Sequence, residues 1–351
     1  MAQTFNDLWK NVIDFENLYY AYRAAGHGKR YRYEALRFAE NLEENLITLQ
    51  NELIWGMYKP LPFRQFYVLE PKKRLISAPA FRDRVVHHAV VRVIEPIFER
   101  KFITDTYACR KGLGTHAAMN HVLWCSRVAQ RRWGSYYVLK CDIRKYFPSV
   151  NHDVLKRILR RSIADREVLA LLDTIIDAYE PEGRGLPIGA LTSQLMANIY
   201  LSPLDHFLKE ECQVRFYARY MDDFVILHRD KAYLKELLAE IDSIVHERLD
   251  LTLNPKTGIF PGHNGIDFCG YRIWPTHIKP RKATVKRAKR RLRKMAKVYQ
   301  KSPQIIVHAR ESIQSFLGYI RYCSGWKTTA SVLERVVFKA TSGIDESDTR
   351  D

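Results

Sequence analysis

The spacing of apolar residues along the chain predicts a series of helices. In 33–55, Leu36, Ala39, Leu42 and Leu46 recur at intervals of three and four residues, which is the pattern of a helix with one packed side. By the same reasoning we expect one helix in 5–25, one in 84–98, one in 115–132, two in 151–179, one in 192–211 and one in 231–248. Near the end of the chain we expect a helix in 303–323, a loop over GWKTT and a last helix near 330–340.

Shorter apolar runs between these helices predict strands. Runs at 66–69 and 75–78, bounded by prolines, predict a small β-ribbon. The segment 136–143, YYVLKCDI, is rich in β-branched and aromatic residues, so we expect a central strand there. The run 214–229 is apolar and aromatic on both sides of one acidic pair, which is typical of a hairpin with carboxylates at its turn. With several short strands expected in 251–274, the pattern predicts an α+β fold.

Length and charge narrow the class of protein. The 351 residues allow two or three packed units, because single cores usually stop growing at about 250–300 residues. The 57 Lys and Arg against 39 Asp and Glu give a net charge of +18, which predicts nucleic acid as the partner, with an anionic membrane surface as second candidate. No apolar run is long enough to span a bilayer, and acids stand where a signal peptide would be basic and then apolar. We therefore expect a protein without a membrane anchor, located in the cytoplasm.

The cysteines give no sign of a metal site. No CxxC pair occurs, and no tight Cys/His spacing of the kind that zinc sites use. We expect all of them to be reduced and most of them to be buried as small apolar side chains: Cys109, Cys125, Cys141, Cys212, Cys269 and Cys323.

One segment near the end of the chain is exceptionally basic. From 279 to 301 there are twelve Lys and Arg and no acid, while Val285, Ala288, Leu292 and Met295 keep helical spacing. We expect a helix that packs on one face and follows duplex phosphates with the other, although such a run can also be a solvated face. The candidate phosphate contacts are Lys286, Arg287, Lys289, Arg290, Arg291, Arg293 and Lys294.

Three acids are the candidate catalytic residues. Asp142 ends the predicted central strand, and Asp222 and Asp223 stand at the predicted hairpin turn. Any one of them could be an ordinary turn residue or a helix cap, but here apolar strand formers flank the acids directly. Burying three carboxylates together is costly without cations, and carboxylates that bridge two Mg²⁺ ions are what nucleotidyl transfer requires. The acids can converge only if their strands are neighbours in one sheet.

Four segments resemble reverse transcriptases. The tetrapeptide YMDD at 220–223 looks like the YxDD motif, and CDIRKYFPSV at 141–150 resembles the strand with the first catalytic Asp. KKRLISAPAFRDRVVHHAV at 72–90 resembles the fingers segment of bacterial members, and DFCGYRI at 267–273 the motif near the primer end. The resemblance implies a right-hand polymerase fold: an N-terminal helical extension in 1–60, fingers in 61–135 with part of 151–190, a palm in 136–275, a helical basic thumb in 276–340 and a flexible tail in 341–351.

A narrower resemblance is to the reverse transcriptases of diversity-generating retroelements. The loop at 188–194 reads IGALTSQ, the IGxxxSQ form that is characteristic of that family. TYACRKGLGTHAA at 106–118, and GYRIWPTH with the following VKRAKRR, also look like it. The resemblance implies RNA-directed DNA polymerisation that copies a template-repeat RNA into adenine-mutagenised cDNA, in a bacterial cell or a phage-infected host. Implied partners are template RNA, the cDNA or primer, dNTPs and a small basic oligomeric accessory variability protein.

The resemblance also implies roles for single residues. Asp142, Asp222 and Asp223 match the ligands of two Mg²⁺ ions, for which Mn²⁺ can substitute, with the backbone carbonyl of Ile143 as an extra oxygen. Phe147 matches the aromatic gate that excludes a ribose 2′ hydroxyl; its alternative is a plain core aromatic. The remaining expected nucleotide contacts are Lys73, Arg74, Ile188, Gly189, Gln194, Tyr220 and Met221.

Ile188 departs from the wider superfamily. Retroviral and group II intron enzymes carry a glutamine there, which touches the incoming nucleotide, and an apolar side chain cannot make that hydrogen bond. Our hypothesis is that Ile188 contributes to adenine miscopying by loosening selection. Two alternatives stay open: a retron or phage-defence reverse transcriptase, and a catalytically silent RNA-binding scaffold. His87 and His88 are interpreted as structural, since a two-metal mechanism needs no histidine.

Overall fold

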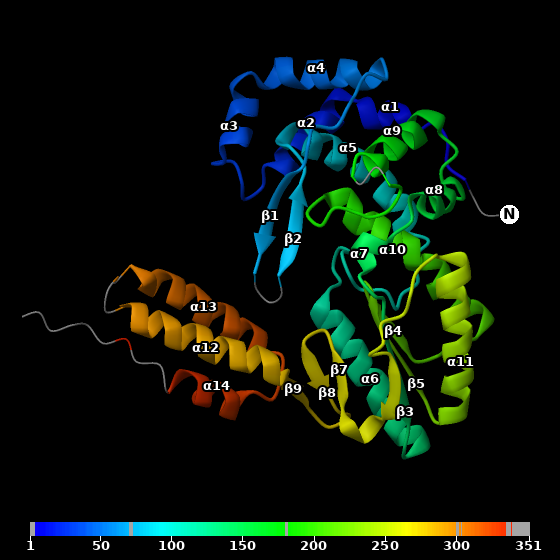
Figure 1. Ribbon diagram of the computed structural model, residues 1–351, viewed down its shortest axis with the longest axis vertical. Helices are drawn as coiled ribbons and strands as arrows, with labels where there is room; N and C mark the ends of the chain where they lie inside the picture. The colour runs from blue at the N-terminus through cyan, green and yellow to red at the C-terminus, as the bar shows by residue number, and fades with distance from the viewer. Residues whose placement is uncertain are drawn as a thin grey trace, which may run out of the picture. The chain divides into compact units, whose positions relative to one another are not determined.

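The computed structural model of the chain (Figure 1) describes residues 4–69, 73–179, 182–299, 302, 304–334 and 338. Its contacts divide the chain into two compact units. The first unit consists of Met1–Gly114, Leu139–Ile226 and Lys231–Ile259, and the second of Thr115–Val138, Leu227–Asp230 and Phe260–Asp351.

The N-terminal helices are shorter than the apolar pattern indicates. The two expected helices are four: α1 (Trp9–Ile13), α2 (Phe15–Ala25), α3 (Tyr33–Glu40) and α4 (Leu42–Ile54). The first break falls at Asp14, whose side chain accepts a hydrogen bond from the Asn17 amide and so caps α2. The second falls at Asn41, whose backbone leaves the helical region. Both residues are Asx types that prefer to start a helix rather than continue one.

The next elements of the first unit confirm the expected ribbon and helix. β1 (Arg64–Val68) pairs antiparallel with β2 (Arg74–Ala78), and α5 (Phe81–Glu99) follows. Figure 1 shows α2 running alongside α5. The carboxylate of Asp83 in α5 accepts the Tyr58 hydroxyl at 3.0 Å and the Leu61 amide at 2.9 Å, so the segment before β1 is held against this helix.

The expected central strand and hairpin form one sheet. Its strand order is β4 (Tyr217–Tyr220), β5 (Asp223–His228), β3 (Tyr137–Asp142) and β6 (Gly258–Pro261). β4 and β5 are antiparallel, with Tyr220 opposite Asp223, so Met221 and Asp222 form the turn. β3 lies directly beside β5, which is the adjacency that the acids require.

Helices complete the first unit around these strands. They are α7 (Tyr146–Ser149), α8 (His152–Arg160), α9 (Arg166–Asp177), α10 (Leu191–His206) and α11 (Lys231–Ser243). The expected helices 192–211 and 231–248 each finish in a wider π-type turn, at Phe207–Glu211 and Ile244–Arg248. α10 is apolar on nearly all sides and is buried almost throughout, so it belongs to the core.

The second unit combines α6 (Thr115–Trp133) with a small sheet and three helices. The sheet is antiparallel in the order β7 (Ile266–Phe268), β8 (Tyr271–Ile273) and β9 (Ile278–Pro280). A short 3₁₀ turn, Gly262–Asn264, precedes it, and α12 (Lys282–Tyr299), α13 (Ile305–Ile320) and α14 (Trp326–Leu333) follow. Figure 1 shows α12 and α13 side by side, and their core is built from Leu292, Phe316, Ile320 and Val332.

Two expectations for this unit and the cysteines are wrong. The loop expected over GWKTT is the first turn of α14, where the Thr329 amide donates to the Gly325 carbonyl; burial of Val332 overrides the low helix propensity of the segment. Of the six cysteines, all free, only Cys125 and Cys141 are buried, and Cys109 is exposed. Residues 335–337, 339 and 340 of the expected helix 330–340, and the whole of the tail 341–351, lie outside the described residues.

The mixed helix and sheet architecture with antiparallel pairing confirms the α+β fold class. Within the described part of the chain, no helix has both the length and the apolar character needed to cross a membrane.

Candidate active site

The three candidate acids lie at neighbouring strand ends. Asp142 is the last residue of β3, and Asp222 and Asp223 lie at the β4–β5 turn. The Ile143 amide donates to the Asp222 carbonyl oxygen at 3.2 Å, which joins the end of β3 to the turn. The predicted convergence of acids that are far apart in sequence is therefore present in the fold.

Burial and mutual repulsion act on these carboxyl groups. Burial raises the pKa of Asp222 to about 6, and the negative charge of Asp142 contributes to the same rise. Burial also raises the pKa of Asp223 to about 6, although the Lys140 ammonium, 3.2 Å from its Oδ2, acts in the opposite direction. A cation among these groups would remove both the burial cost and the repulsion.

The donor set fits a divalent metal. Oδ1 of Asp223 is buried without a hydrogen-bond partner, so this oxygen is available to a ligand. Carboxylates are the hard oxygen donors that Mg²⁺ prefers. Over the residues that the structure describes, no three acidic, His or Cys side chains already surround one point, so the three carboxylates are neighbours rather than a closed ligand shell.

A residue that the sequence did not single out holds Asp142 in place. The Asn254 side-chain amide donates to Oδ2 of Asp142 at 2.7 Å, and its backbone amide donates to the Asp142 carbonyl at 2.7 Å. Asn254 reaches this position because Ile143 and Leu253 pair as an isolated antiparallel bridge. In the sequence it precedes a proline, which indicates only a turn.

Two expected nucleotide contacts lie on or beside the β-ribbon. Arg74 begins β2, and its positive charge acts to lower the pKa of Asp222, so it belongs to the same electrostatic site. The Lys73 ammonium lies 4.4 Å from the centre of the Tyr67 ring. A guanidinium near the acids suits the oxygens of a triphosphate.

The IGxxxSQ loop packs against β2. The Ile188 carbonyl accepts the Ser77 amide at 3.0 Å. Gly189 has a φ of +129°, and a Cβ there would lie 3.0 Å from Cγ2 of Ile76, which explains the glycine. Gln194 is exposed near the start of α10. The fold thus brings the loop and the ribbon together without a gap for a larger residue at 189.

Phe147 lies in α7 and remains partly exposed. Its carbonyl accepts the Leu186 amide at 2.8 Å, and its ring meets that of Tyr146 edge-on at 5.7 Å. Tyr146, 2% exposed, is the core aromatic of this pair, so the plain core interpretation fits Tyr146 better than Phe147.

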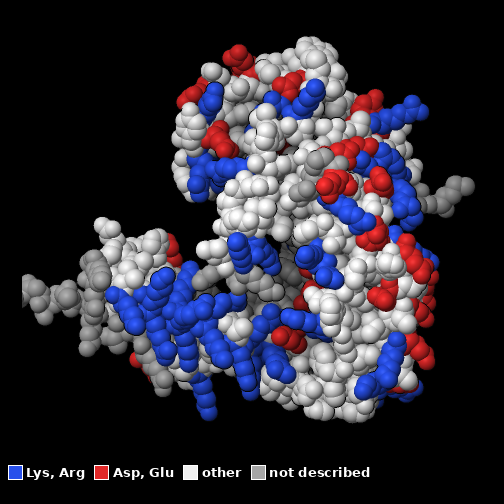
Figure 2. Space-filling view, viewed as in Figure 1, with Lys and Arg blue, Asp and Glu red and all other residues white. Residues whose placement is uncertain are grey.

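The basic helix has the two faces that its sequence predicts. Leu292 is buried in the core of the second unit, while Lys286, Arg290, Arg291, Arg293 and Lys294 are exposed. Figure 2 shows Lys and Arg gathered over α12. Arg287 and Lys289 are partly buried, so they are weaker candidates for contact with phosphate.

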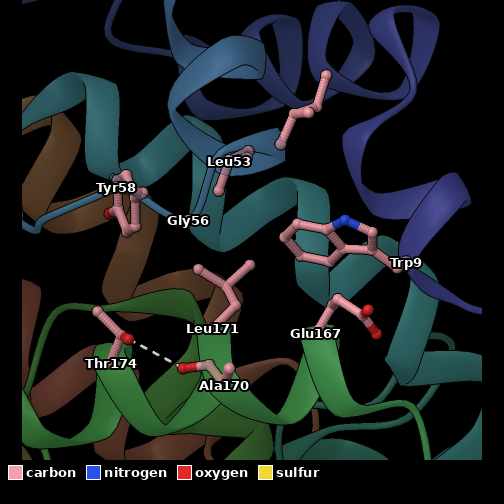
Figure 3. A pocket seen from close by; sticks show the side chains of 9 residues that line it. Trp9, Leu53, Gly56, Tyr58, Glu167, Ala170, Leu171 and Thr174 are labelled. Carbon is pink, nitrogen blue, oxygen red and sulfur yellow. Dashed lines mark hydrogen bonds between the residues drawn. The ribbon is translucent and has the colours of Figure 1, made fainter.

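The histidines and the pocket in Figure 3 lie outside this chemistry. His87 is buried, with Nδ1 2.9 Å from the Thr192 hydroxyl oxygen, and burial lowers its pKa to about 3. The pocket has a volume of about 170 Å³ and contains none of the expected site residues. It is lined by Trp9, Leu53, Ile54, Gly56, Tyr58, Glu167, Ala170, Leu171 and Thr174 (Figure 3).

A strand-end Asp beside a hairpin that carries two more, within an α+β fold, defines a polymerase-type site for nucleotidyl transfer. The family model for reverse transcriptase (RNA-dependent DNA polymerase) matches residues 69–273, which is more than half of the chain. The chain therefore belongs to the reverse transcriptase family. The expected fold and enzyme class, a right-hand polymerase that is an RNA-directed DNA polymerase, are confirmed by this match.

The chain is also similar to curated proteins and to solved structures. Protein YkfC of Escherichia coli (strain K12) is 30% identical over 277 residues, which cover 66% of this chain and 72% of YkfC. The group II intron-encoded protein LtrA of Lactococcus lactis subsp. cremoris is 27% identical over 176 residues, which cover 47% of this chain but only 28% of LtrA. A solved telomerase from Candida albicans, in complex with a fragment of telomeric RNA, matches with a TM-score of 0.48 and 14% identity over 80% of this chain and 56% of the telomerase.

Reverse transcriptases generally use divalent metal ions and bind template RNA, so the coarse expectations for cofactor and partner are confirmed at the level of the family.

Proposed function

We propose that the chain copies an RNA template into DNA by nucleotidyl transfer at Asp142, Asp222 and Asp223. The observation that carries this proposal is the adjacency of β3 and β5, which brings the three acids to one place. Bound there, two Mg²⁺ ions would activate the primer 3′ hydroxyl and neutralise the leaving pyrophosphate, and Mn²⁺ could replace them.

The protein side chains bind and orient the reactants. The three carboxylates and the Ile143 carbonyl hold the ions, while Asn254 fixes the rotamer of Asp142 through its 2.7 Å hydrogen bond. Other side chains act on the incoming dNTP: Lys73 and Arg74 bind its triphosphate, Phe147 excludes a ribose 2′ hydroxyl, and Ile188, Gly189, Gln194, Tyr220 and Met221 form the rest of its pocket.

The predicted division of the fold is part of the same proposal. Residues 1–60 form the N-terminal extension, 61–135 with part of 151–190 the fingers, 136–275 the palm and 276–340 the thumb. In this scheme α12 follows the phosphates of the template–product duplex, which supplies affinity without sequence information.

We further propose that the enzyme serves a diversity-generating retroelement. The IGxxxSQ loop supports this, because it replaces with Ile188 the glutamine of related enzymes and packs directly on β2, the strand that carries Arg74. The product would be adenine-mutagenised cDNA of a template-repeat RNA. The partner would be a small basic oligomeric accessory variability protein, in the cytoplasm of a bacterial or phage-infected cell.

One experiment tests both levels. The purified protein is incubated with its own flanking transcript, Mg²⁺ and dNTPs, with and without the neighbouring small basic protein, and any cDNA is sequenced. We expect cDNA with substitutions concentrated at template adenines. Accurate cDNA would refute the retroelement assignment and favour a retron or defence enzyme, whereas no cDNA under any condition would refute the polymerase.

Replacing Ile188 with Gln tests the fidelity hypothesis. If the apolar side chain loosens selection, the Gln variant makes fewer errors at template adenines, while errors at the other three bases change little. Ile188→Leu is the matched control, since it keeps the apolar character and should keep the parental errors. Equal adenine errors in the parent and in Ile188→Gln would contradict the hypothesis.

A further inference from the structure

One charged side chain is completely buried below the catalytic turn. Arg219 in β4 is 0% exposed and is the largest of the fully buried side chains among the described residues. A buried guanidinium is costly unless it is paired and its N–H groups are used. Every contact that it makes is therefore informative about why an arginine stands here.

Two nitrogens of the Arg219 guanidinium donate hydrogen bonds to one equally buried carboxylate. Arg219 Nε donates to Oδ1 of Asp205 at 2.7 Å, and Nη2 donates to Oδ2 at 2.5 Å, which is the two-pronged pairing that suits arginine. Asp205 lies in α10, is 0% exposed and also accepts the Tyr217 hydroxyl at 2.7 Å and the Thr106 hydroxyl at 3.0 Å. With four hydrogen bonds, this carboxylate is a fixed anchor in the core.

The third nitrogen of the guanidinium, Nη1, donates to the turn that carries the acids. Nη1 of Arg219 donates to the Met221 carbonyl oxygen at 2.9 Å, and it also lies 3.3 Å from Oδ1 of Asn198. Asn198 is itself held by the Ala108 carbonyl, to which its side-chain amide donates at 2.6 Å. The carbonyl of Met221 belongs to the peptide group that leads into Asp222.

The backbone at this turn needs such support. Met221 has a φ of +58°, and Asp222 does not share a positive φ, which is the sign pattern of a type II′ hairpin turn. That turn prefers glycine at its first central position, so a methionine there is strained. Arg219 can stabilise this strained turn because its own backbone is held in place. Its amide donates to the Asp105 carbonyl, and its carbonyl accepts from the Tyr107 amide.

We propose that Arg219, anchored by Asp205, is a positioning residue that holds the turn so that Asp222 and Asp223 meet their metal ions. The inference rests on the proposed function of these acids as metal ligands. Stability alone does not explain an arginine here, because well-packed apolar residues of similar volume often stabilise a core as well as a buried salt bridge does. What the arginine adds is the hydrogen bond from Nη1 to the Met221 carbonyl, which belongs to the peptide group leading into the acidic pair.

The test compares variants that remove the hydrogen bond from Arg219 to the Met221 carbonyl with one variant that keeps it. Arg219→Lys keeps the charge beside Asp205 but cannot reach both the carboxylate and the turn. The double variant Arg219→Gln with Asp205→Asn removes both charges, so it leaves no buried ion unpaired if the single variant fails to fold. Tyr217→Phe is the control, because it removes one hydrogen bond to Asp205 and leaves the hydrogen bond from Arg219 to the Met221 carbonyl in place.

Two readouts separate positioning from stability. The first is the rise in melting temperature on adding Mg²⁺, which reports metal binding in the absence of any substrate. The second is primer extension, measured as kcat, KM for template–primer and the Mg²⁺ concentration for half-maximal rate. For the variants at Arg219 we expect a Mg²⁺ requirement raised about tenfold or more, a lower kcat and an unchanged KM for template–primer. Tyr217→Phe should lower the melting temperature without moving the Mg²⁺ requirement.

The outcomes decide between the two roles. Parental Mg²⁺ dependence in both the Lys and the double variant would overturn the proposal. So would an equal shift in Tyr217→Phe, because the effect would then follow stability alone. If the parent makes no cDNA, the proposed function fails, yet the Mg²⁺-induced shift in melting temperature still tests whether Arg219 positions the acids.

Discussion

At the scale of single residues, Asp222 and Asp223 oppose folding when no cation is present. The pKa of each is raised from an ordinary carboxyl value of 3.8 to about 6, chiefly by burial. Between these two values the unfolded chain holds fewer protons than the folded one. Their contribution to stability is therefore lost as the pH rises from about 4 to about 6, and the full cost is present at neutral pH.

We accordingly expect Asp223→Asn to stabilise the metal-free protein. At pH 7.5 in EDTA its free energy of unfolding should exceed that of the parent by about 1–2 kcal/mol, measured by urea unfolding. In Mg²⁺ the order should reverse or narrow, because the parent gains more from metal binding. A metal-free midpoint equal to or below that of the parent would show that burial of this carboxylate carries no net cost.

His87 gives a second prediction with the opposite sign. Burial lowers its pKa to about 3 from 6.5, so the unfolded chain binds a proton that the folded chain does not. Stability should then fall as the pH drops below about 6.5, by up to about 1.4 kcal/mol per pH unit. His87→Asn should flatten this dependence in urea unfolding between pH 4 and 7. The exposed His308, changed to Asn, is the control and should leave the slope as it is.

At the scale of elements, α12 is one helix with two different faces, one apolar and packed in the core and the other basic and exposed. Leu292 packs with Phe316, Ile320 and Val332, and the exposed cations face away from that core. The apolar spacing was enough to predict this division, because helical periodicity places residues three and four apart on one side. The ends of the N-terminal helices could not be predicted in this way. Asp14 and Asn41 interrupt continuous apolar patterns through local backbone preferences, which periodicity does not report.

Neutralising the exposed face of α12 should weaken nucleic-acid binding in a salt-dependent way. With Arg290, Arg291, Arg293 and Lys294 changed to Gln, the slope of log K against log salt should become shallower by about 3, at 0.7–0.9 per phosphate contact. Fluorescence anisotropy with an RNA–DNA duplex measures it. Lys231 and Lys235 on α11, changed to Gln, are the control; an equal loss of slope per residue changed would mean that the effect follows net charge rather than α12.

At the scale of the whole molecule, binding and catalysis should be separable. The chain has 57 basic residues and a net charge of +18, so many side chains can contribute to RNA binding. The proposed chemistry, in contrast, depends on three acids. Asp142→Ala should therefore lower primer extension by about 10³-fold or more, since several kcal/mol of transition-state stabilisation are lost with the metal site. Affinity for RNA should be unchanged or slightly higher. If the variant extends primers at the parental rate, the three-acid site is not the catalytic centre.

The same comparison addresses the scaffold alternative. A catalytically silent RNA-binding protein would show no primer extension in the parent, and no difference between the parent and Asp142→Ala. The family match to reverse transcriptases, together with a complete set of acids at one place, favours the active enzyme.

The sequence by itself determined what depends on neighbours along the chain: the strand that ends at Asp142, the hairpin whose turn carries Asp222 and Asp223, the β-ribbon and the two faces of α12. These follow from periodicity and turn chemistry, which act over a few residues. Only the tertiary structure decided that Asn254 fixes Asp142, that Arg219 and Asp205 lie beneath the acidic turn, and that the segment after Gly325 is helical. The reason is physical: whether a polar group is buried, and which distant partner satisfies it, is settled by packing.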